Sequence, residues 1–261
     1  MPDDATADDA AARARAWLHA QHEAVCDVVE PWAHGTLLRA TRHPNYYAFN
    51  LVRVEEQPLM GVDELAKIAD GALAGLSHRC IDFDDARHAD RLRAEFEASG
   101  WEATRLLWMR HEDPPPPGPA IQVEEVPYEA VRELRAAWHR EDFPGVDPTD
   151  FLDQAREVAE SRNVQVLAVS EEGRLVAYAQ LERPGDGAEI SQVYVHPEYR
   201  GGGRGTAMTR AAIEAADSVR DLWITADDDD RPKELYGRLG FRTAWTSMEL
   251  LLLPGRGSAE S

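Results

Sequence analysis

The stretch Arg200-Gly201-Gly202-Gly203-Arg204-Gly205-Thr206 decides how the second half of this chain folds. The run before it, 189–195, is rich in β-branched residues and predicts a strand, whereas the run after it, 207–216, predicts a helix. Glycines let the backbone turn tightly and remove the Cβ atoms that would hold a phosphate away. The first turn of a helix offers free N–H groups at the positive end of its dipole. The sequence therefore predicts an anion site that suits a pyrophosphate.

Two other nucleotide-binding patterns fit this loop less well. A P-loop needs a Lys and then a Ser or Thr after its last glycine, but Gly205 is followed by Thr206 and Ala207. The dinucleotide fingerprint G-x-G-x-x-G is not matched either. It also needs an acidic residue at the end of the next strand, and Asp227 could serve. The dinucleotide alternative is therefore weakened and stays open.

A third pattern, Arg/Gln-x-x-Gly-x-Gly/Ala, is matched by Arg200, Gly203 and Gly205, and Leu235-Tyr236-Gly237-Arg238-Leu239-Gly240-Phe241 follows it further along the chain. These two motifs resemble the acyl-CoA loop and the Leu-Tyr-x-x-x-Gly-Phe element of the GCN5-related N-acetyltransferase (GNAT) superfamily. The resemblance implies an α+β fold in which helices flank a mixed, largely antiparallel central sheet. Gly240 fits a helix end that needs a positive φ.

A proline-rich segment, Asp113–Pro119, predicts the division of the chain, because consecutive prolines cannot continue a helix or join a strand ladder. The expected parts are an N-terminal region (1–112), a linker (113–119), a complete GNAT domain (120–255) and a flexible tail (256–261). In the GNAT domain we expect strands at 121–126, 164–170, 175–181, 189–195, 221–226 and 241–253, and helices at 128–140, 150–162, 206–216 and from Asp229 or Asp230.

The N-terminal region shows a weaker match to the same predicted order of strands and helices. Residues 94–101 align with 234–241, which places Phe96, a residue without a proton to give, at the position of Tyr236. Where the second half has its glycine loop, residues 55–61 offer two acids and one glycine, which will not cradle a pyrophosphate. The other expected elements are a strand at 46–54, a helix at 62–74 and a strand at 78–83. We interpret this region as a degenerate GNAT-like unit, with an unrelated α+β accessory domain as the alternative.

The composition of the chain limits which partners and which cellular location are expected. The 261 residues carry a net charge of −20, which argues against nucleic-acid binding and favours a cationic amine, unless the charge serves only solubility. No apolar run predicts a membrane span, and the acidic N-terminus lacks the form of a signal peptide. Two cysteines, Cys26 and Cys80, fit a cytoplasmic protein with reduced thiols. The strong preference for arginine over lysine suggests a GC-rich bacterial genome.

Acyl transfer from a thioester to an amine sets three chemical requirements. A protonated alkylamine must lose a proton before it attacks, the oxyanion needs hydrogen-bond donors, and an acid helps the CoA thiolate to depart. By resemblance to the family, Tyr236 is the acid. Glu189 is the expected proton acceptor, with Tyr194 and His139 as alternatives. An ordinary exposed strand residue is the other interpretation of Glu189.

The resemblance also implies acetyl-CoA as the co-substrate. The backbone of 193–195 is expected to hold the acetyl carbonyl, and residues 138–151 to line the acceptor side. Asp229 stands where the family more often has an Asn, and the acids at 227–230 suit a helix start rather than a metal, so no metal site is expected. The expected cofactor-binding residues are Val193, Tyr194, Val195, Arg200, Gly201, Gly202, Gly203, Arg204, Gly205, Thr206, Asp229 and Tyr236.

We therefore expect an acetyl-CoA-dependent N-acetyltransferase that acts on a primary amine of a small molecule or a peptide, with only the second half active. The alternative is a non-catalytic, regulatory acyl-CoA-binding protein. The protein is expected to be a monomer with an internal pseudo-dimer or a homodimer. The identity of the acceptor stays open, because this fold supports antibiotics, polyamines, amino acids and protein N-termini alike.

Overall fold

The structure, a computed structural model, describes residues 4–253, which fall into two compact units. Unit 1 comprises residues 4–108, 227–230 and 244–253, and unit 2 comprises 109–226 and 231–243. These units differ from the expected division, because most of the last strand, β11 (Phe241–Leu252), clusters with unit 1 and the linker at 113–119 clusters with unit 2. The expected tail at 256–261 lies outside the described residues.

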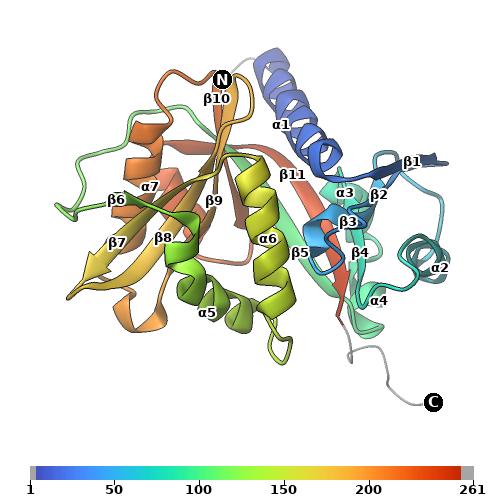
Figure 1. Cartoon of the computed structure of the whole chain (residues 1–261). Helices are drawn as coiled ribbons and strands as arrows, with labels where there is room; N and C mark the ends of the chain where they lie inside the picture. Colours follow the sequence, from blue (N-terminus) through green and yellow to red (C-terminus); the bar gives the residue numbers. More distant parts are fainter. Residues whose placement is uncertain (1–3, 254–261) are drawn as a thin grey trace. The chain divides into compact units, whose positions relative to one another are not determined.

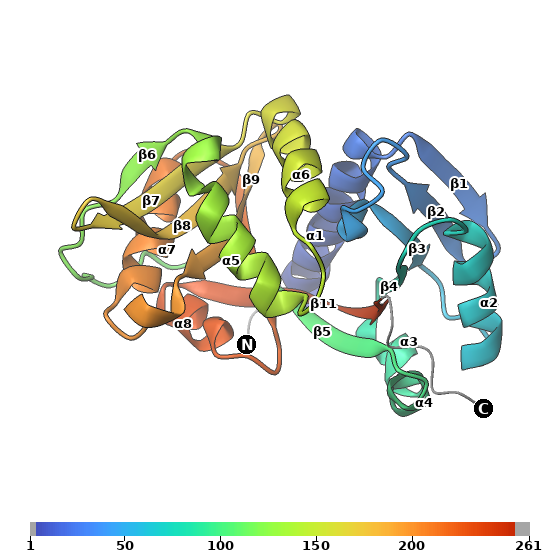
Figure 2. The same cartoon turned by 60° about the horizontal axis from the view of Figure 1, so that its bottom comes forward.

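Unit 2 is built on a sheet with the strand order β10-β9-β8-β7-β6. Neighbouring strands from β6 to β9 are antiparallel, whereas β10 runs parallel to β9. Helix α7 packs against β7, β8 and β9, and α5 and α6 cover the opposite face (Figures 1 and 2). The strands are β6 (Glu124–Val126), β7 (Gln165–Glu171), β8 (Arg174–Glu182), β9 (Gly187–Val195) and β10 (Asp221–Asp227). The helices are α5 (Arg132–Asp142), α6 (Thr149–Ser161), α7 (Arg204–Ala215) and α8 (Pro232–Arg238), with short 3-10 turns at Tyr128–Val131 and Pro197–Tyr199.

Beneath α5, unit 2 has an apolar core because its strands alternate. Val166 and Ala168 on β7 are two residues apart and therefore face the same side as Tyr178 and Tyr194, against Leu134 of α5. Next to this cluster, the Arg135 guanidinium is 1% exposed and lies 4.5 Å from the ring centroid of Tyr128 and 5.8 Å from that of Phe151. Such cation–π contacts let a buried charge stack on aromatic faces.

Unit 1 has the strand order β1-β2-β3-β4-β11-β5. Its first three strands form an antiparallel meander, β4 runs parallel to β3, and β11 pairs antiparallel with β4 from Met248↔Phe83 to Leu252↔Arg79. The strands are β1 (Val28–Trp32), β2 (Gly35–Arg39), β3 (Asn50–Val54), β4 (Arg79–Phe83) and β5 (Glu102–His111). The helices are α1 (Asp4–Val25), α2 (Val62–Ala72), α3 (Ala86–Asp90) and α4 (Arg93–Ala98), with a 3-10 turn at Tyr47–Phe49.

The two faces of the unit 1 sheet differ in character. The apolar face packs on α2 and α4 through residues such as Val52, Ile81 and Phe96, all of which are fully buried. The opposite face carries a cross-strand row of charged residues, because Arg53, Asp82 and Glu249 occupy paired positions on β3, β4 and β11. Burial, reinforced by the neighbouring carboxylates Asp84 and Glu249, raises the pKa of Asp82 well above its usual value.

Helix α1 contributes to this charged face, which corrects one interpretation of the sequence. The spacing of His19 and His22 fits an exposed helix face, but His22 is 4% exposed and His19 Nε2 lies 2.9 Å from the Asp84 carboxylate. Both histidines therefore face the unit rather than solvent.

The predicted strand 46–54 is wrong at its start, and the reason is one buried side chain. Asn50 is 0% exposed, accepts the N–H of Ala40 at 3.1 Å, and donates to the carbonyls of His43 and Tyr46 at 2.9 and 3.0 Å. These bonds hold the chain in a turn over Tyr47–Phe49, so β3 begins only at Asn50. The strand predicted at 121–126 likewise begins late, at Glu124.

The helix expected from Asp229 or Asp230 begins at Pro232. Proline suits the first helical position, where its missing N–H costs nothing. The preceding acids form a turn, in which the N–H of Asp229 donates to the Asp227 carboxylate at 2.8 Å, and no side chain caps α8. The interpretation of these acids as a helix cap is therefore wrong.

The proline-rich segment packs on unit 2 instead of acting as a free spacer. Arg210 of α7 donates to the carbonyl of Pro116, and a Cβ on Gly203 would lie 3.2 Å from Pro119. At the other end, the backbone N–H groups of Glu112 and Asp113 donate to the carbonyl of Gly240 at 2.9 and 3.2 Å. Gly240 has φ +95°, as predicted, and a Cβ there would lie 1.9 Å from the Asp113 carbonyl oxygen, so only glycine fits.

Within residues 4–253, no helix is long and apolar enough to cross a membrane, and no group of side chains has the makings of a metal site. Cys26 and Cys80 are both buried free thiols. Burial raises the pKa of the Cys26 thiol to about 12, so both cysteines act as small apolar residues.

Candidate active site

The glycine loop of unit 2 opens the first turn of α7. Gly201 and Gly203 have φ +84° and +83°, a backbone conformation that other residues rarely adopt. Gly203 is the N-cap residue of α7, and neither a side-chain cap nor an acidic residue occupies the first turn. The N–H groups at the start of a helix have no intrahelical partner. The N-terminus of α7 can therefore receive an anion.

Two further glycines show which side chains lie next to the loop. A Cβ on Gly202 would lie 2.2 Å from the Arg204 guanidinium, which bonds to Glu171 and to the Tyr199 carbonyl instead of turning toward a ligand. A Cβ on Gly205 would lie 3.8 Å from Leu235 and 3.9 Å from Val195. The first turn of α7 therefore lies close to the end of β9 and to α8, which carries Tyr236.

Strands β9 and β10 separate beside this loop. Their parallel pairing runs from Gly187↔Asp221 to Ile190↔Ile224 and then stops, although β9 continues to Val195. A bulge at Gln192, which has φ +51°, shifts the pairing of β9 with β8 and bends the strand. The β10-facing backbone groups of residues 193–195 therefore have no ladder partner on β10. We call this opening the fork.

One carboxylate links α5 to both the fork and the loop. Glu141 accepts a hydrogen bond from the Tyr194 hydroxyl, and its other oxygen lies 2.6 Å from the Arg200 guanidinium. Arg200 also donates to the Val195 carbonyl at 3.0 Å. The sequence placed Glu141 only within an acceptor-lining region, and no local pattern indicates a contact with a residue 59 positions away.

The charges of this cluster are set by its contacts. Burial alone would raise the pKa of Glu141, but the hydrogen bond from Tyr194 and the nearby Arg200 outweigh it and lower the pKa. Burial, together with the hydrogen bond to Glu141, raises the pKa of Tyr194 well above its usual value. At neutral pH the cluster is therefore a carboxylate, a neutral phenol and a guanidinium.

Glu189 lies at the closed end of the fork. It is opposite Glu182 on β8 and beside Trp223 on β10. Because Glu182 and Tyr178 are four residues apart on β8, Glu189 lies on the same face as Tyr178, which is the face that α5 covers. The structure thus places Glu189 and Tyr194 on one face of β9.

The other predicted site residues differ in their placement. Tyr236 is 6% exposed on α8 and makes an edge contact with Phe241 at 6.3 Å between centroids. His139 is 2% exposed among Phe143 and Phe151, and burial lowers its pKa. Asp229 lies in unit 1, where its carboxylate is 3.3 Å from Arg93.

Comparison with known proteins identifies the class of domain that carries this site. The acetyltransferase (GNAT) family model matches residues 128–241, all of which lie in unit 2 except 227–230. Residues 128–241 therefore resemble the GNAT family, in line with the two sequence motifs.

A curated relative extends the comparison to a particular protein. The chain is 35% identical over 133 residues to mycothiol acetyltransferase from Nocardia farcinica (strain IFM 10152), a match that covers 48% of this chain. It covers 42% of that relative, so the chain spans less than half of the relative's length.

Solved structures share the fold over most of the chain. A functionally unknown conserved protein from Staphylococcus epidermidis ATCC 12228 matches with a TM-score of 0.65 and 14% identity, covering 88% of this chain and 94% of that one. A GCN5-related N-acetyltransferase from Kribbella flavida matches with a TM-score of 0.56 and 20% identity, covering 94% and 96%. The predicted α+β class, with helices flanking a mixed sheet, is confirmed.

Proposed function

We propose that the protein is an acetyl-CoA-dependent N-acetyltransferase that moves an acetyl group to a primary amine, with its active site in unit 2. The observation that carries this proposal is an uncapped glycine-rich helix N-terminus beside an open fork, within a region that resembles the GNAT family. The similarity to mycothiol acetyltransferase favours a small-molecule acceptor over a peptide.

The N-terminus of α7 fits a pyrophosphate, because free N–H groups converge where the glycines leave no Cβ in the way. We assign the pyrophosphate to the backbone of Gly201–Thr206 and the acetyl carbonyl to the backbone of 193–195 within the fork. When bound, acetyl-CoA supplies an acetyl group activated as a thioester. Asp229, whose carboxylate lies 3.3 Å from Arg93, stays a proposed cofactor-binding residue by family resemblance alone.

In the proposed reaction, the amine nitrogen bonds to the thioester carbon while the carbon–sulfur bond breaks. The protonated amine first gives one proton to Glu189, its proposed acceptor. After the attack, Tyr236 gives its proton to the departing sulfur, and the nitrogen gives its second proton to the Tyr236 oxygen. Backbone N–H groups of the fork stabilise the negative charge on the carbonyl oxygen. Glu141 offers an ionised carboxylate on the same side as Glu189, where it can attract a cationic amine.

The alternative is a non-catalytic acyl-CoA-binding protein that keeps the loop without turnover. Replacing Tyr236 by Phe separates the two, because it removes one hydroxyl and keeps the ring that packs on Phe241. We expect CoA release in the presence of small amines to fall by about 10²- to 10⁴-fold, the usual loss for a general acid. The acetyl-CoA affinity, measured by titration, should stay within about twofold.

A matched control is Tyr199→Phe, because Tyr199 lies in the turn before the loop and packs on Arg204 and His196. This control should keep its turnover. A wild-type protein that binds acetyl-CoA but releases no CoA with any amine would favour the regulatory alternative.

A further inference from the structure

We propose that unit 2 carries a second binding pocket, for a small amphipathic anion, between α5 and the β7–β8 turn. The pocket has a volume of about 600 Å³, which lies within the range of small-molecule sites. His196 is among its lining residues, but no residue of 197–206 is. The pocket is therefore separate from the N-terminus of α7, where we place the pyrophosphate.

One side of the pocket, along α5 and the turn before it, carries small apolar side chains. Ala130, Leu134 and Ala137 follow one another at helical spacing and present one face to the pocket, and Leu175 of β8 lies across from them. Leu134 is 5% exposed and belongs to the core under α5, so packing against that core holds this side of the pocket in place. Alanines at the other positions leave room for the flat or aliphatic body of a ligand.

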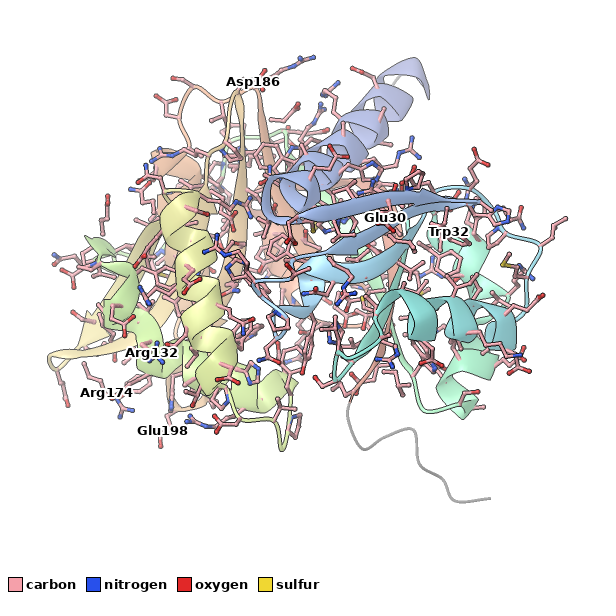
Figure 3. The ribbon with its side chains drawn as sticks, turned by 45° about the vertical axis from the view of Figure 1, so that its right-hand side comes forward. Glu30, Trp32, Arg132, Arg174, Asp186 and Glu198 are labelled. Carbon is pink, nitrogen blue, oxygen red and sulfur yellow. The ribbon has the colours of Figure 1, made fainter. Side chains whose placement is uncertain are left out.

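The rim of the pocket is held in place by a tight turn. Glu172 and Gly173 have φ +51° and +79°, the signs of a type I′ hairpin turn, which places Arg174 at the first position of β8. The backbone N–H of His196 donates to the Val176 carbonyl at 2.9 Å and fixes this histidine beside the same strand. Figure 3 shows Arg174 at the end of the sheet away from Asp186, on the same side as Glu198.

The charges of the rim favour an anion. Arg140 and Arg174 are both exposed, and neither forms an ion pair with any residue between 4 and 253. Other arginines of unit 2 are held by carboxylates, among them Arg132, Arg156, Arg162, Arg200, Arg204, Arg210 and Arg242.

Two guanidinium groups at one pocket contrast with the net charge of −20 of the chain, although Arg140 also interacts electrostatically with the Asp147 carboxylate. The lining includes one carboxylate, Glu133, and Glu198 lies 3.8 Å from His196. A guanidinium binds carboxylate, phosphate and sulfonate groups through paired hydrogen bonds. The ligand class is therefore a molecule with such an anionic group on an apolar body, its head at Arg140 and Arg174 and its body against Leu134 and Leu175.

Two probes of the same shape test this assignment. Anilinonaphthalene sulfonate carries the anionic group and the apolar body, and phenylnaphthylamine is the same molecule without the sulfonate. The full-length protein should bind the sulfonate at least about tenfold more tightly, by fluorescence titration. An Arg140→Gln/Arg174→Gln variant should lose this preference while it still binds phenylnaphthylamine. An Arg156→Gln variant, which removes an exposed arginine of α6, should keep the preference.

The proposal is overturned if the wild type shows no preference for the sulfonate, or if the double variant keeps it. Acetyl-CoA binding, measured on the same variants by the shift in melting temperature, should be unchanged. If the double variant loses acetyl-CoA binding as well, the pocket is part of the acyl-CoA site, and a separate site is excluded. A wild type that does not bind acetyl-CoA would overturn the proposed function and leave the comparison of the two probes standing.

Discussion

From its three-strand meander on, each half of this chain continues with a helix, a strand, one or two short helices and a last strand, yet the helices that follow the meanders begin in opposite ways. Helix α7 starts at Gly203 with no acid in its first turn. Helix α2 starts at Gly61 with Asp63 and Glu64 in its first turn, and the Glu64 carboxylate accepts the N–H of Gly61 at 3.3 Å. A carboxylate that already occupies a helix N-terminus repels a phosphate. This difference supports the proposal that the second half alone binds the pyrophosphate.

The two parallel strand pairs, β9–β10 and β3–β4, also differ, because only the first pair separates. In the second half, β9 and β10 separate after Ile190. In the first half, β3 stays paired with β4 to its last residue, through Val54↔Phe83, and the N–H of Asp84 still donates to the Val54 carbonyl at 3.0 Å. A closed pair leaves no backbone groups free for a thioester. We therefore propose that acyl-CoA binding requires both an open loop and an open fork, which the second half alone has.

The largest expected effect concerns the independence of the second half. A chain that begins at residue 113 lacks β4, the strand that pairs with β11 from Met248 to Leu252. It also loses the packing of Met248 and Leu250 against Ile81 and Phe83. We therefore expect this fragment to show no cooperative unfolding transition by circular dichroism, because an unpaired apolar strand edge is exposed.

Co-expression provides the control for this truncation. Residues 1–112 made together with 113–261 as two separate chains should restore a cooperative transition, because all strands are then present. A fragment 113–261 that unfolds cooperatively and binds acetyl-CoA with full affinity would show that the second half is an independent domain.

The next effect tests the link between α5 and the fork. Replacing Glu141 by Gln keeps the size of the side chain but removes the charge that Arg200 and Tyr194 contact. We expect kcat/KM for a cationic amine to fall by about tenfold, equivalent to about 1.4 kcal/mol, with little change in acetyl-CoA affinity. Steady-state kinetics in both substrates measures this, and Glu160→Gln on the exposed face of α6 is the matched control. An equal loss in acetyl-CoA affinity would contradict the assignment of Glu141 to the acceptor side.

The smallest expected effect is a change in the stability of the protein without a change in its activity. Burial raises the pKa of Asp82 in the folded state above its ordinary value of 3.8, so the folded protein holds a proton that the unfolded chain releases. The stability that this proton gives is complete below pH 3.8 and is lost as the pH rises through the folded pKa. Asp82→Asn should therefore raise the free energy of unfolding at pH 7, because the variant avoids the cost of keeping or losing that proton.

Urea denaturation at pH 5 and pH 8 measures the effect of Asp82→Asn, with the exposed Asp70→Asn as control. The gain should be larger at the higher pH, and turnover should not change. A loss of stability at pH 8 would show that the Asp82 carboxylate is ionised and paired in the folded protein.

The sequence predicts unit 2 well where the signals are local. Glycine positions with positive φ, such as Gly203 and Gly240, mark the start of α7 and the end of α8, and the alternation of apolar residues places β7, β8 and β9. These features depend on neighbouring residues only. That the first half is a degenerate GNAT unit stays a prediction, although the order of its elements matches.

Contacts between distant residues could not be predicted. Pairing of β11 with β4 joins 248–252 to 79–83, and nothing in either segment selects that partner over another apolar strand. The Glu141–Arg200 contact and the turn imposed by Asn50 are likewise set by the fold around them. Single polar side chains of this kind carry no periodic signal.

The most direct test of the account is the shift in melting temperature on adding acetyl-CoA to the wild type, Gly205→Asp and Gly205→Asn. Gly205 has space for a Cβ and a helical backbone, so neither substitution strains the loop. An acid in the first turn of α7 should stabilise the free protein by about 0.3–1 kcal/mol and still repel a pyrophosphate.

Acetyl-CoA at a hundredfold excess over its Kd should stabilise the wild type by about 2.7 kcal/mol. We predict that Gly205→Asn keeps most of this shift and that Gly205→Asp loses it without a fall in its own melting temperature. A Gly205→Asp protein that shows the full wild-type shift would contradict the assignment of the acyl-CoA site to the N-terminus of α7.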